Sequence, residues 1–271
     1  MRALLFDLDN TLLMEDEATF SAVRRACELA RDRVRADEDA LYAAVVRVAD
    51  ELWRAAPTYP YAEEMGMWWG EGLWGEFGGD APGLRALHAF VPGFRRDVWR
   101  GAFAAVGAGD DTLASELDAA YATARRAYQP VDPEAESVLD DLARDHRLAL
   151  VTNGAPDVQR EKLAGTTLAE RFGAIVISAE LGIAKPDRRI FEHALRSVGA
   201  GRDDAVMIGD SLPRDIAGAS NAGLRSIWID RGDGPPRPED AVPDARVTAL
   251  SQIRSCLVAL GPGAASPRGS P

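Results

Sequence analysis

Short apolar segments alternate with helical segments through the second half of the chain, and this alternation limits the possible folds most. Buried strands are expected at residues 148–151, 174–178, 205–209, 226–229 and 246–248. Helices are expected between and after them, at residues 133–145, 156–164, 187–198, 213–222 and 250–260. Strands joined by right-handed helical crossovers form a parallel sheet covered on both faces. The sequence therefore predicts an α/β fold with a doubly wound parallel sheet.

A separate apolar run at the N-terminus belongs with these later strands. Residues 2–6 predict a strand that ends at Asp7. Residues 16–128 then have an almost wholly helical pattern, with apolar side chains at alternating steps of three and four. The clearest stripes contain Phe20, Val23, Cys27, Ala30 and Val34, and then Leu41, Val45, Val48 and Leu52. Because the first strand precedes this block and the other strands follow it, we expect the block to be an insertion.

These patterns predict a core domain of two chain segments and an inserted helical cap domain. The core would take residues 1–15 and 129–260, and the all-helical cap would take residues 16–128. Within the cap, residues 59–78 are rich in Gly and Trp without periodicity, so we expect a loop or a broken helix that decides the substrate. Most tryptophans of this block are expected in its core. Residues 261–271 have the composition of a disordered tail.

Composition and charge exclude several classes of partner. The chain has 271 residues, 46% hydrophobic and 27% charged, which is the balance of a globular protein with a sizeable core. Its net charge of −12 argues against general binding to nucleic acid or to an anionic membrane, but not against a small anionic substrate. No apolar run is long enough for a signal peptide or a membrane span, and Cys27 and Cys256 lie far apart. We therefore expect a cytoplasmic protein.

Polar side chains follow three of the expected strands directly. Asp7 and Asp9 come after the first strand, Thr152 follows the second, and Asp210 follows the strand at 205–209. Paired carboxylates at the edge of a core are unfavourable unless a cation or a proton relieves them. Ligands of doubly wound sheets bind beyond the carboxyl ends of the strands. The sequence therefore predicts that these side chains converge on one crevice.

Four motifs, in order along the chain, resemble those of the haloacid dehalogenase superfamily. They are DLDNT at 7–11, VTNG at 151–154, Lys185 within ELGIAKPDRRIF, and GDSLPRD at 209–215. Each lies at the strand end or loop where the family has it, and four motifs in order are a specific signal. The resemblance is to the phosphatase branch with an inserted helical cap, and it implies a Rossmann-like core. It covers the core segments, whereas the cap is similar only as a helical insertion.

The resemblance implies Mg²⁺ as cofactor and phosphoryl transfer through an aspartate. Asp7 would be the nucleophile that forms an aspartyl-phosphate, and it would bind the metal together with the Asp9 backbone carbonyl and the Asp210 carboxylate. A cation is needed because two unit charges about 4 Å apart repel by about 4 kcal/mol at a protein surface. Asp9 would act as general acid and then as general base. It would begin protonated because neighbouring acids crowd it.

The same motifs imply the remaining site residues. Phosphate contacts are expected from backbone N–H groups and polar side chains at Leu8, Thr11, Thr152, Asn153 and Lys185. Lys185 also counts as catalytic because its charge would meet both the phosphoryl oxygens and Asp7. Thr11 is expected to bond to Asp9 or to close the turn. Behind these residues, Ser211 and Asp215 would support the site, with Asp215 orienting Lys185 or a metal-bound water.

The expected function is Mg²⁺-dependent hydrolysis of a small phosphomonoester, of the sugar phosphate, phosphoglycolate or nucleoside monophosphate class. A phosphosugar mutase of the same superfamily stays open, since it differs in how the cap shields the intermediate from water. A 2-haloacid dehalogenase needs neither an acid at Asp9 nor a metal, so Asp9 and Asp210 argue against it. A phosphate-binding regulatory protein without turnover is a further alternative. The oligomeric state, monomer or homodimer, is left open.

Overall fold

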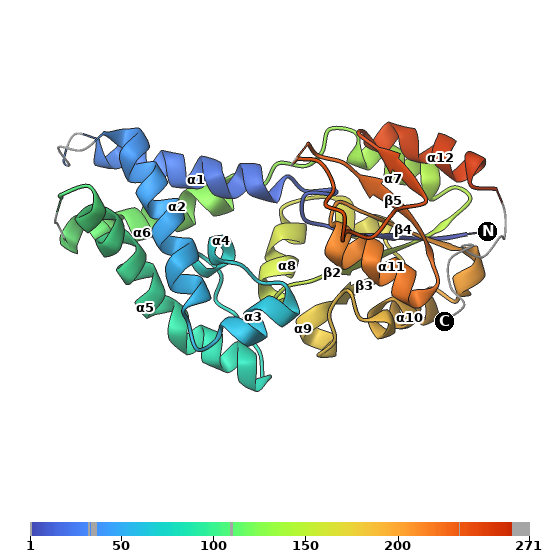
Figure 1. Ribbon diagram of the computed structural model, residues 1–271, viewed down its shortest axis with the longest axis horizontal. Helices are drawn as coiled ribbons and strands as arrows, with labels where there is room; N and C mark the ends of the chain where they lie inside the picture. The colour runs from blue at the N-terminus through green and yellow to red at the C-terminus, as the bar shows by residue number, and fades with distance from the viewer. Residues whose placement is uncertain (1, 32, 34–36, 109–110, 233, 262–271) are drawn as a thin grey trace. The chain divides into compact units, whose positions relative to one another are not determined.

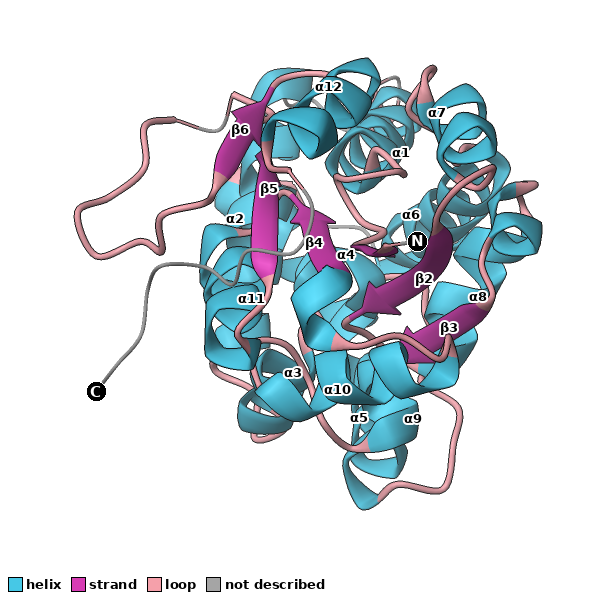
Figure 2. Ribbon diagram, turned by 90° about the vertical axis from the view of Figure 1, so that its right-hand side faces the viewer, coloured by secondary structure: helices cyan, strands magenta, loops and turns pink. Residues whose placement is uncertain are grey.

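The computed structural model describes residues 2–31, 33, 37–108, 111–232 and 234–261, and a six-stranded parallel sheet lies at the centre of its α/β part. The strands are β1 (Ala3–Phe6), β2 (Arg147–Thr152), β3 (Ala174–Ile177), β4 (Ala205–Gly209), β5 (Arg225–Ile229) and β6 (Ala245–Val247). Their order is β3-β2-β1-β4-β5-β6, so the N-terminal strand is central (Figure 2). Every predicted strand is present to within one residue at either end.

Alternate residues of each strand point to opposite faces of the sheet, and both faces are buried. Leu4 and Phe6 of β1 belong to one apolar cluster, whereas Ala3 and Leu5 belong to the other. The same division holds for β2 and β4. A strand buried on both sides is apolar throughout, which explains the uninterrupted run from residue 3 to residue 6. The prediction of a doubly wound parallel sheet is confirmed.

Helices cover both faces of this sheet (Figure 1). One cluster takes side chains from α7 (Ala135–Leu142), α8 (Pro156–Ala164) and α12 (Ile253–Ala259). The other takes side chains from α10 (Arg188–Ser197) and α11 (Ala217–Ala222). Close packing joins the last two helices, since a Cβ on Gly218 would lie 2.5 Å from Cζ of Phe191. The α10 helix follows the loop that carries Lys185, and α11 follows the turn that carries Asp215. The packing of the two helices therefore helps to position both segments.

Several helix boundaries differ from those expected. The helix predicted to begin at Pro133 begins instead at Ala135, because the Asp132 carboxylate accepts a hydrogen bond from the Glu134 backbone N–H and closes a turn first. The helix predicted over 213–222 opens with a π-helical turn, Leu212–Ile216, before α11, and it ends before Gly223 as predicted. A short helix, α9 (Ser178–Leu181), was not predicted. Residues 262–271 of the expected tail lie outside the described residues.

A second compact unit, formed by residues 15–130 and 155–158, is helical. Its helices are α1 (Glu15–Ala30), α2 (Glu38–Arg54), α3 (Tyr59–Met65), α4 (Trp69–Gly72), α5 (Pro82–Ala105) and α6 (Asp111–Ala127), and the start of α8. The segment 59–78 is a broken helix, as expected, because α3 and α4 are separate. Both apolar stripes lie on helices with buried faces, although Val34 falls outside the described residues.

The tryptophans of this helical unit mostly pack inside it. Trp53, Trp69, Trp74 and Trp99 are buried. Among them, the Trp53 ring lies 5.3 Å from the Phe94 ring and the Trp69 ring lies 6.0 Å from the Phe20 ring, measured between ring centroids. Large buried rings of this kind contribute to packing before any other role. Within the described part of the chain, no helix has both the length and the apolar character needed to span a bilayer.

Phe191→Ala should destabilise the α/β unit strongly. The ring is fully buried between the sheet and α11, so its removal leaves a cavity, and such truncations cost about 3–5 kcal/mol. Urea unfolding followed by far-UV circular dichroism measures the change. Phe90→Ala, at an intermediate position on α5, is the comparison and should cost clearly less. Equal losses for the two variants would contradict the packing described here.

Candidate active site

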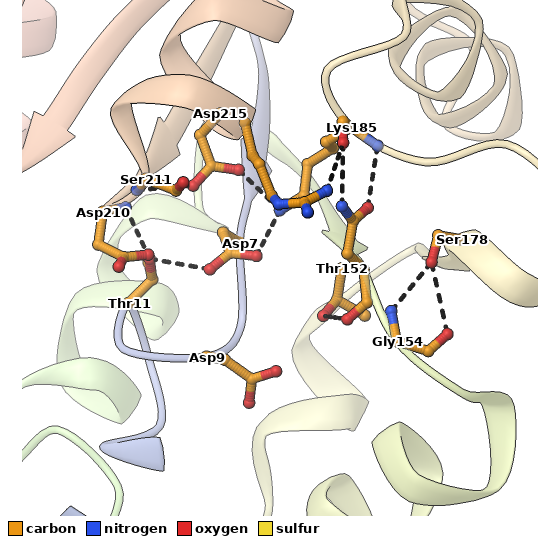
Figure 3. A network of polar contacts seen from close by, with 12 residues as sticks. Asp7, Asp9, Thr11, Thr152, Gly154, Ser178, Lys185, Asp210, Ser211 and Asp215 are labelled. Carbon is orange, nitrogen blue, oxygen red and sulfur yellow. Dashed lines mark hydrogen bonds and ion pairs between the residues drawn. The ribbon is translucent and has the colours of Figure 1, made fainter. Parts of the chain in front are cut away.

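Three carboxylates gather beyond the carboxyl ends of β1 and β4 (Figure 3). Asp7 follows β1, Asp210 follows β4, and Asp215 lies in the π-helical turn after it. The Asp7 backbone N–H donates to the Ile208 carbonyl at 2.9 Å, which sets the two strand ends side by side. One oxygen from each carboxylate lies within 4.8 Å of the others. The predicted convergence of Asp7 and Asp210 is therefore present in the structure.

Lys185 is the cation at this cluster. Its ammonium group forms ion pairs with the Asp7 carboxylate and, at 2.7 Å, with Asp215 Oδ1. The lysine side chain is only 2% exposed. Its backbone is clamped by Asn153, whose Nδ2 donates to the Lys185 carbonyl at 3.0 Å and whose Oδ1 accepts from the Lys185 N–H at 2.9 Å. The Asn153 side chain thus positions the lysine loop, a contact that sequence reasoning did not anticipate.

Burial and like charges raise the pKa values of the clustered acids. Burial raises the pKa of Asp7 to about 7, and the neighbouring carboxylates of Asp215 and Asp9 add to the rise. Lys185 opposes it. The pKa of Asp210 is also raised well above its usual value, first by burial and then by Asp7 and Asp215. Burial alone lowers the pKa of Lys185, but its two carboxylate partners outweigh this and raise it, so the lysine is charged.

Thr11 joins the two strand ends. Its hydroxyl lies 3.2 Å from Asp7 Oδ2 and 3.2 Å from Asp210 Oδ1, and it accepts from the Asp210 backbone N–H at 3.1 Å. Of the two alternatives expected for Thr11, the structure shows the second, since its N–H donates to the Leu8 carbonyl at 3.3 Å and helps to close the turn. The hydroxyl points toward β4 and contacts Asp7 and Asp210. The turn itself is closed by the Leu8 carbonyl, which accepts from the N–H groups of residues 11–13. The roles of Thr11 and of the Leu8 N–H toward phosphate stay predictions.

Asp215 is held rigidly behind the site. Its Oδ2 accepts from the Ser211 backbone N–H at 3.1 Å, and its side chain is fully buried. The carboxylate also packs against the backbone of Gly209, where a Cβ would lie 2.2 Å from Asp215 Oδ2. Only glycine fits there, which explains why β4 ends in Gly209 before Asp210. The supporting position expected for Ser211 and Asp215, and the contact of Asp215 with Lys185, are both present in the structure.

Asp9 lies apart from this cluster and has different partners. Figure 3 shows its carboxylate set away from the Asp7–Lys185 pair. Oδ1 pairs with the Lys162 ammonium at 3.0 Å, and Oδ2 accepts from Gln159 Nε2 at 2.9 Å. The expectation that neighbouring acids crowd Asp9 and keep it protonated is not supported, because the partners of its two oxygens are an ammonium group and an amide N–H. Neither donor was predicted from the sequence. The available signals were that Gln159 and Lys162, three residues apart, share one face of α8, and that the 271-residue chain contains only two lysines, Lys162 and Lys185.

Thr152 meets the same helix. Gln159 Nε2 donates to Thr152 Oγ1 at 2.6 Å, so one amide group bonds to both Thr152 and Asp9. Thr152 also donates to the Asn153 carbonyl at 3.3 Å and is buried. The Thr152 side chain therefore lies on the side of the site that α8 lines. The contacts of Thr152 and Asn153 with phosphate stay predictions.

The donor set fits a hard divalent cation. Carboxylate oxygens are the preferred ligands of Mg²⁺. Burial first, and then the neighbouring carboxylates, raise the pKa values of Asp7 and Asp210, so a second cation beside Lys185 would stabilise both carboxylates. Asp215 is already engaged by Lys185 and by the Ser211 N–H. Lys185 also pairs with Asp7, but only through Oδ1, whereas Asp7 Oδ2 and Asp210 Oδ1 each lie 3.2 Å from the Thr11 hydroxyl. Asp7 and Asp210 therefore have the carboxylate oxygens better suited to a metal ion.

Asp210→Asn should stabilise the metal-free protein at about pH 8. A buried acid with a raised pKa keeps its proton in the folded state where the unfolded chain has lost it, so its stabilising contribution falls as pH rises above about 4. The neutral amide avoids this loss, and we expect a gain of about 1 kcal/mol at pH 8 that shrinks toward pH 5. Urea unfolding in a chelator measures it.

Addition of Mg²⁺ provides the matched control for this variant. It should stabilise the unmodified chain and leave Asp210→Asn almost unchanged, because the variant lacks one carboxylate ligand. An Asn variant that is less stable in chelator at pH 8, or that Mg²⁺ stabilises equally, would contradict the site described here.

Comparisons with known proteins agree with this geometry. Residues 1–223 match the haloacid dehalogenase-like hydrolase family. A phosphoserine phosphatase of Thermus thermophilus is 42% identical over 254 residues, covering 93% of this chain and 98% of that protein. An N-acylneuraminate-9-phosphatase of Rattus norvegicus is 26% identical, covering 95% of this chain and 94% of that protein.

A solved structure shows the same fold. It is that of a HAD-hydrolase, YfnB of Bacillus subtilis, described as bound to magnesium, with a TM-score of 0.65 and 23% identity over 94% of this chain and 98% of that chain. The family match and the named relatives confirm the prediction of a hydrolase of the phosphatase branch. The chain belongs to the haloacid dehalogenase-like hydrolases.

Proposed function

We propose that the chain hydrolyses a small phosphomonoester with Mg²⁺, through a phosphoryl group carried on Asp7. The observation that carries the proposal is the buried cluster in which one ammonium, Lys185, lies between the carboxylates of Asp7 and Asp215, with Asp210 beside them. A phosphate dianion can bind beside these carboxylates only if positive charge in the site offsets their repulsion. Lys185 and a metal ion held by Asp7 and Asp210 supply that charge.

In the first step, Asp7 attacks the phosphorus atom. A bond forms between a carboxylate oxygen of Asp7 and phosphorus while the bond from phosphorus to the leaving oxygen breaks. Lys185 holds the attacking carboxylate in place and faces the phosphoryl oxygens. Asp9, after taking up a proton from solvent, gives that proton to the leaving oxygen, so that the alcohol departs neutral. Asp7, Asp210 and the Asp9 carbonyl would hold Mg²⁺, which would offset the negative charge of the carboxylate and the phosphate.

In the second step, water attacks the phosphorus atom of the aspartyl-phosphate. Asp9, now a carboxylate, accepts a proton from the water as the new bond to phosphorus forms. The bond between phosphorus and the Asp7 oxygen breaks, which returns the Asp7 carboxylate and releases inorganic phosphate. The N–H groups of Leu8 and Asn153, with the hydroxyls of Thr11 and Thr152, bind the phosphoryl oxygens in both steps. Asp215 and Ser211 keep Lys185 oriented throughout.

The substrate class is proposed from the relatives. The Thermus relative, at 42% identity over nearly its whole length, is named for phosphoserine, and the rat relative for a sugar acid phosphate. Both are small phosphorylated metabolites, which agrees with the net charge of −12 in excluding polyanionic partners. We propose O-phosphoserine as the first candidate. Residues 16–128 would form the cap that selects the alcohol, with 59–78 as its selecting segment.

Asp7→Asn should abolish the release of phosphate. An amide oxygen is a far weaker nucleophile than a carboxylate, and the variant also loses a metal ligand, so we expect kcat to fall at least about 1,000-fold. Phosphate released from p-nitrophenyl phosphate in Mg²⁺ measures this, with Asp187→Asn, an exposed helix cap at the start of α10, as the control variant. A variant that keeps more than a tenth of the activity would contradict the role of Asp7.

A screen of phosphorylated metabolites should separate the proposed function from its alternatives. We expect phosphate release to be fastest with O-phosphoserine, to require Mg²⁺ and to stop in chelator. Isomerised sugar phosphate without net release of phosphate would support a mutase. Chloride released from 2-chloropropionate without metal would support a dehalogenase. Phosphate binding without turnover of any compound would support a regulatory protein, and each of these three outcomes would overturn the proposal.

A further inference from the structure

The Asp9 carboxylate is held at both oxygens by one helix. Lys162 Nζ lies 3.0 Å from Oδ1, and Gln159 Nε2 lies 2.9 Å from Oδ2. Both donors belong to the same face of α8, and Gln159 is fully buried. Two donors on separate oxygens fix the rotation of a carboxylate as well as its position. The α8 helix therefore determines where the Asp9 side chain points.

Lys162 brings a buried positive charge to this contact. Its side chain is 0% exposed, and burying an ammonium group is strongly unfavourable unless a partner compensates its charge. All other basic residues of the chain except Lys185 are arginines or histidines. Each of the two lysines therefore forms an ion pair with one carboxylate of the DLDNT motif, Lys185 with Asp7 and Lys162 with Asp9.

The Lys162 ammonium affects the position of Asp9 because a competing cation, Lys185, lies in the same site. An unpaired Asp9 carboxylate would be attracted to Lys185 and to a metal ion at Asp7. If Asp9 turned toward them, it would compete with the phosphate and would no longer reach the leaving oxygen. The ion pair with Lys162 offers Asp9 a separate partner, which agrees with its position apart from the Asp7–Lys185 pair in Figure 3.

We propose that Lys162 is a positioning residue that holds Asp9 in place for proton transfer and keeps it out of the metal and phosphate site. This proposal rests on the proposed function, because it assumes that Asp9 gives a proton to the leaving oxygen of a phosphomonoester. In this role Lys162 acts through Asp9 and needs no contact of its own with substrate or metal. Its removal therefore impairs one step of the reaction, the departure of a leaving group that needs a proton.

The test compares two aryl phosphates whose leaving groups differ in how much they depend on protonation. p-Nitrophenolate leaves readily without a proton, whereas the phenolate from phenyl phosphate is more basic and needs one. Lys162→Met should lower kcat/KM for phenyl phosphate about 10–100-fold more than for p-nitrophenyl phosphate, since general acid catalysis contributes about 100-fold or more. Lys162→Arg, which keeps the charge, should restore most of the phenyl phosphate activity.

Controls separate this role from a structural one. Arg160→Met removes an exposed cation from the same helix, where it pairs with Glu180, and should affect both substrates little. In the Asp9→Asn background, Lys162→Met should cause no further loss with phenyl phosphate, because the two residues act through one carboxylate. If Lys162→Met does not fold, as judged by circular dichroism, Lys162→Gln makes the same comparison.

Equal losses on both substrates, or a further loss in the Asp9→Asn background, would overturn the proposal for Lys162. Failure of the proposed function gives a different result. In that case the unmodified chain hydrolyses neither aryl phosphate in Mg²⁺, or Asp7→Asn hydrolyses them as well as the unmodified chain does. A loss of activity in Lys162→Met that is larger with phenyl phosphate than with p-nitrophenyl phosphate, together with intact activity of Arg160→Met, supports the proposed function and the role of Lys162.

Discussion

The structure depends on keeping buried carboxylates beside one buried ammonium. Lys185 lies between Asp7 and Asp215, and without it two acids at the edge of an apolar core would repel each other in a poorly solvated place. Much of the surrounding structure serves this arrangement. Asn153 clamps the lysine backbone, and Gly209 leaves room for the Asp215 carboxylate. The remaining negative charge is what makes the site suited to a divalent cation.

Much of this could be predicted from the sequence because the determinants are local. The strand before Asp7 is apolar at every position since it is buried on both faces, and such a run can be recognised without knowing its neighbours. The helix over 156–164 was predicted to the residue, and the acids after β1 and β4 were expected to meet because parallel strands end at one edge. The family motifs added residue roles that the pattern alone does not contain.

Contacts made by side chains across the fold could not be predicted in the same way. Asn153 was assigned to phosphate through its backbone, yet its side chain clamps the Lys185 loop, 32 residues away in sequence. Thr11 was expected to bond to Asp9 or to close the turn. Its N–H does close the turn, but the contact of its hydroxyl with Asp210 was not expected. Lys162 resembled any charged residue on a helix of average polarity. Each case depends on which segment lies opposite, and this is a property of the tertiary structure.

The central claim is that the phosphoryl group passes through Asp7 on its way to water. The stereochemical course at phosphorus tests it most directly, using a phosphorothioate monoester whose phosphorus carries ¹⁶O and ¹⁸O, hydrolysed with Mg²⁺ in ¹⁷O-labelled water so that the released thiophosphate is chiral. Transfer first to Asp7 and then to water inverts the configuration twice, so the account predicts overall retention. Overall inversion would show direct attack by water on the substrate and would contradict the account.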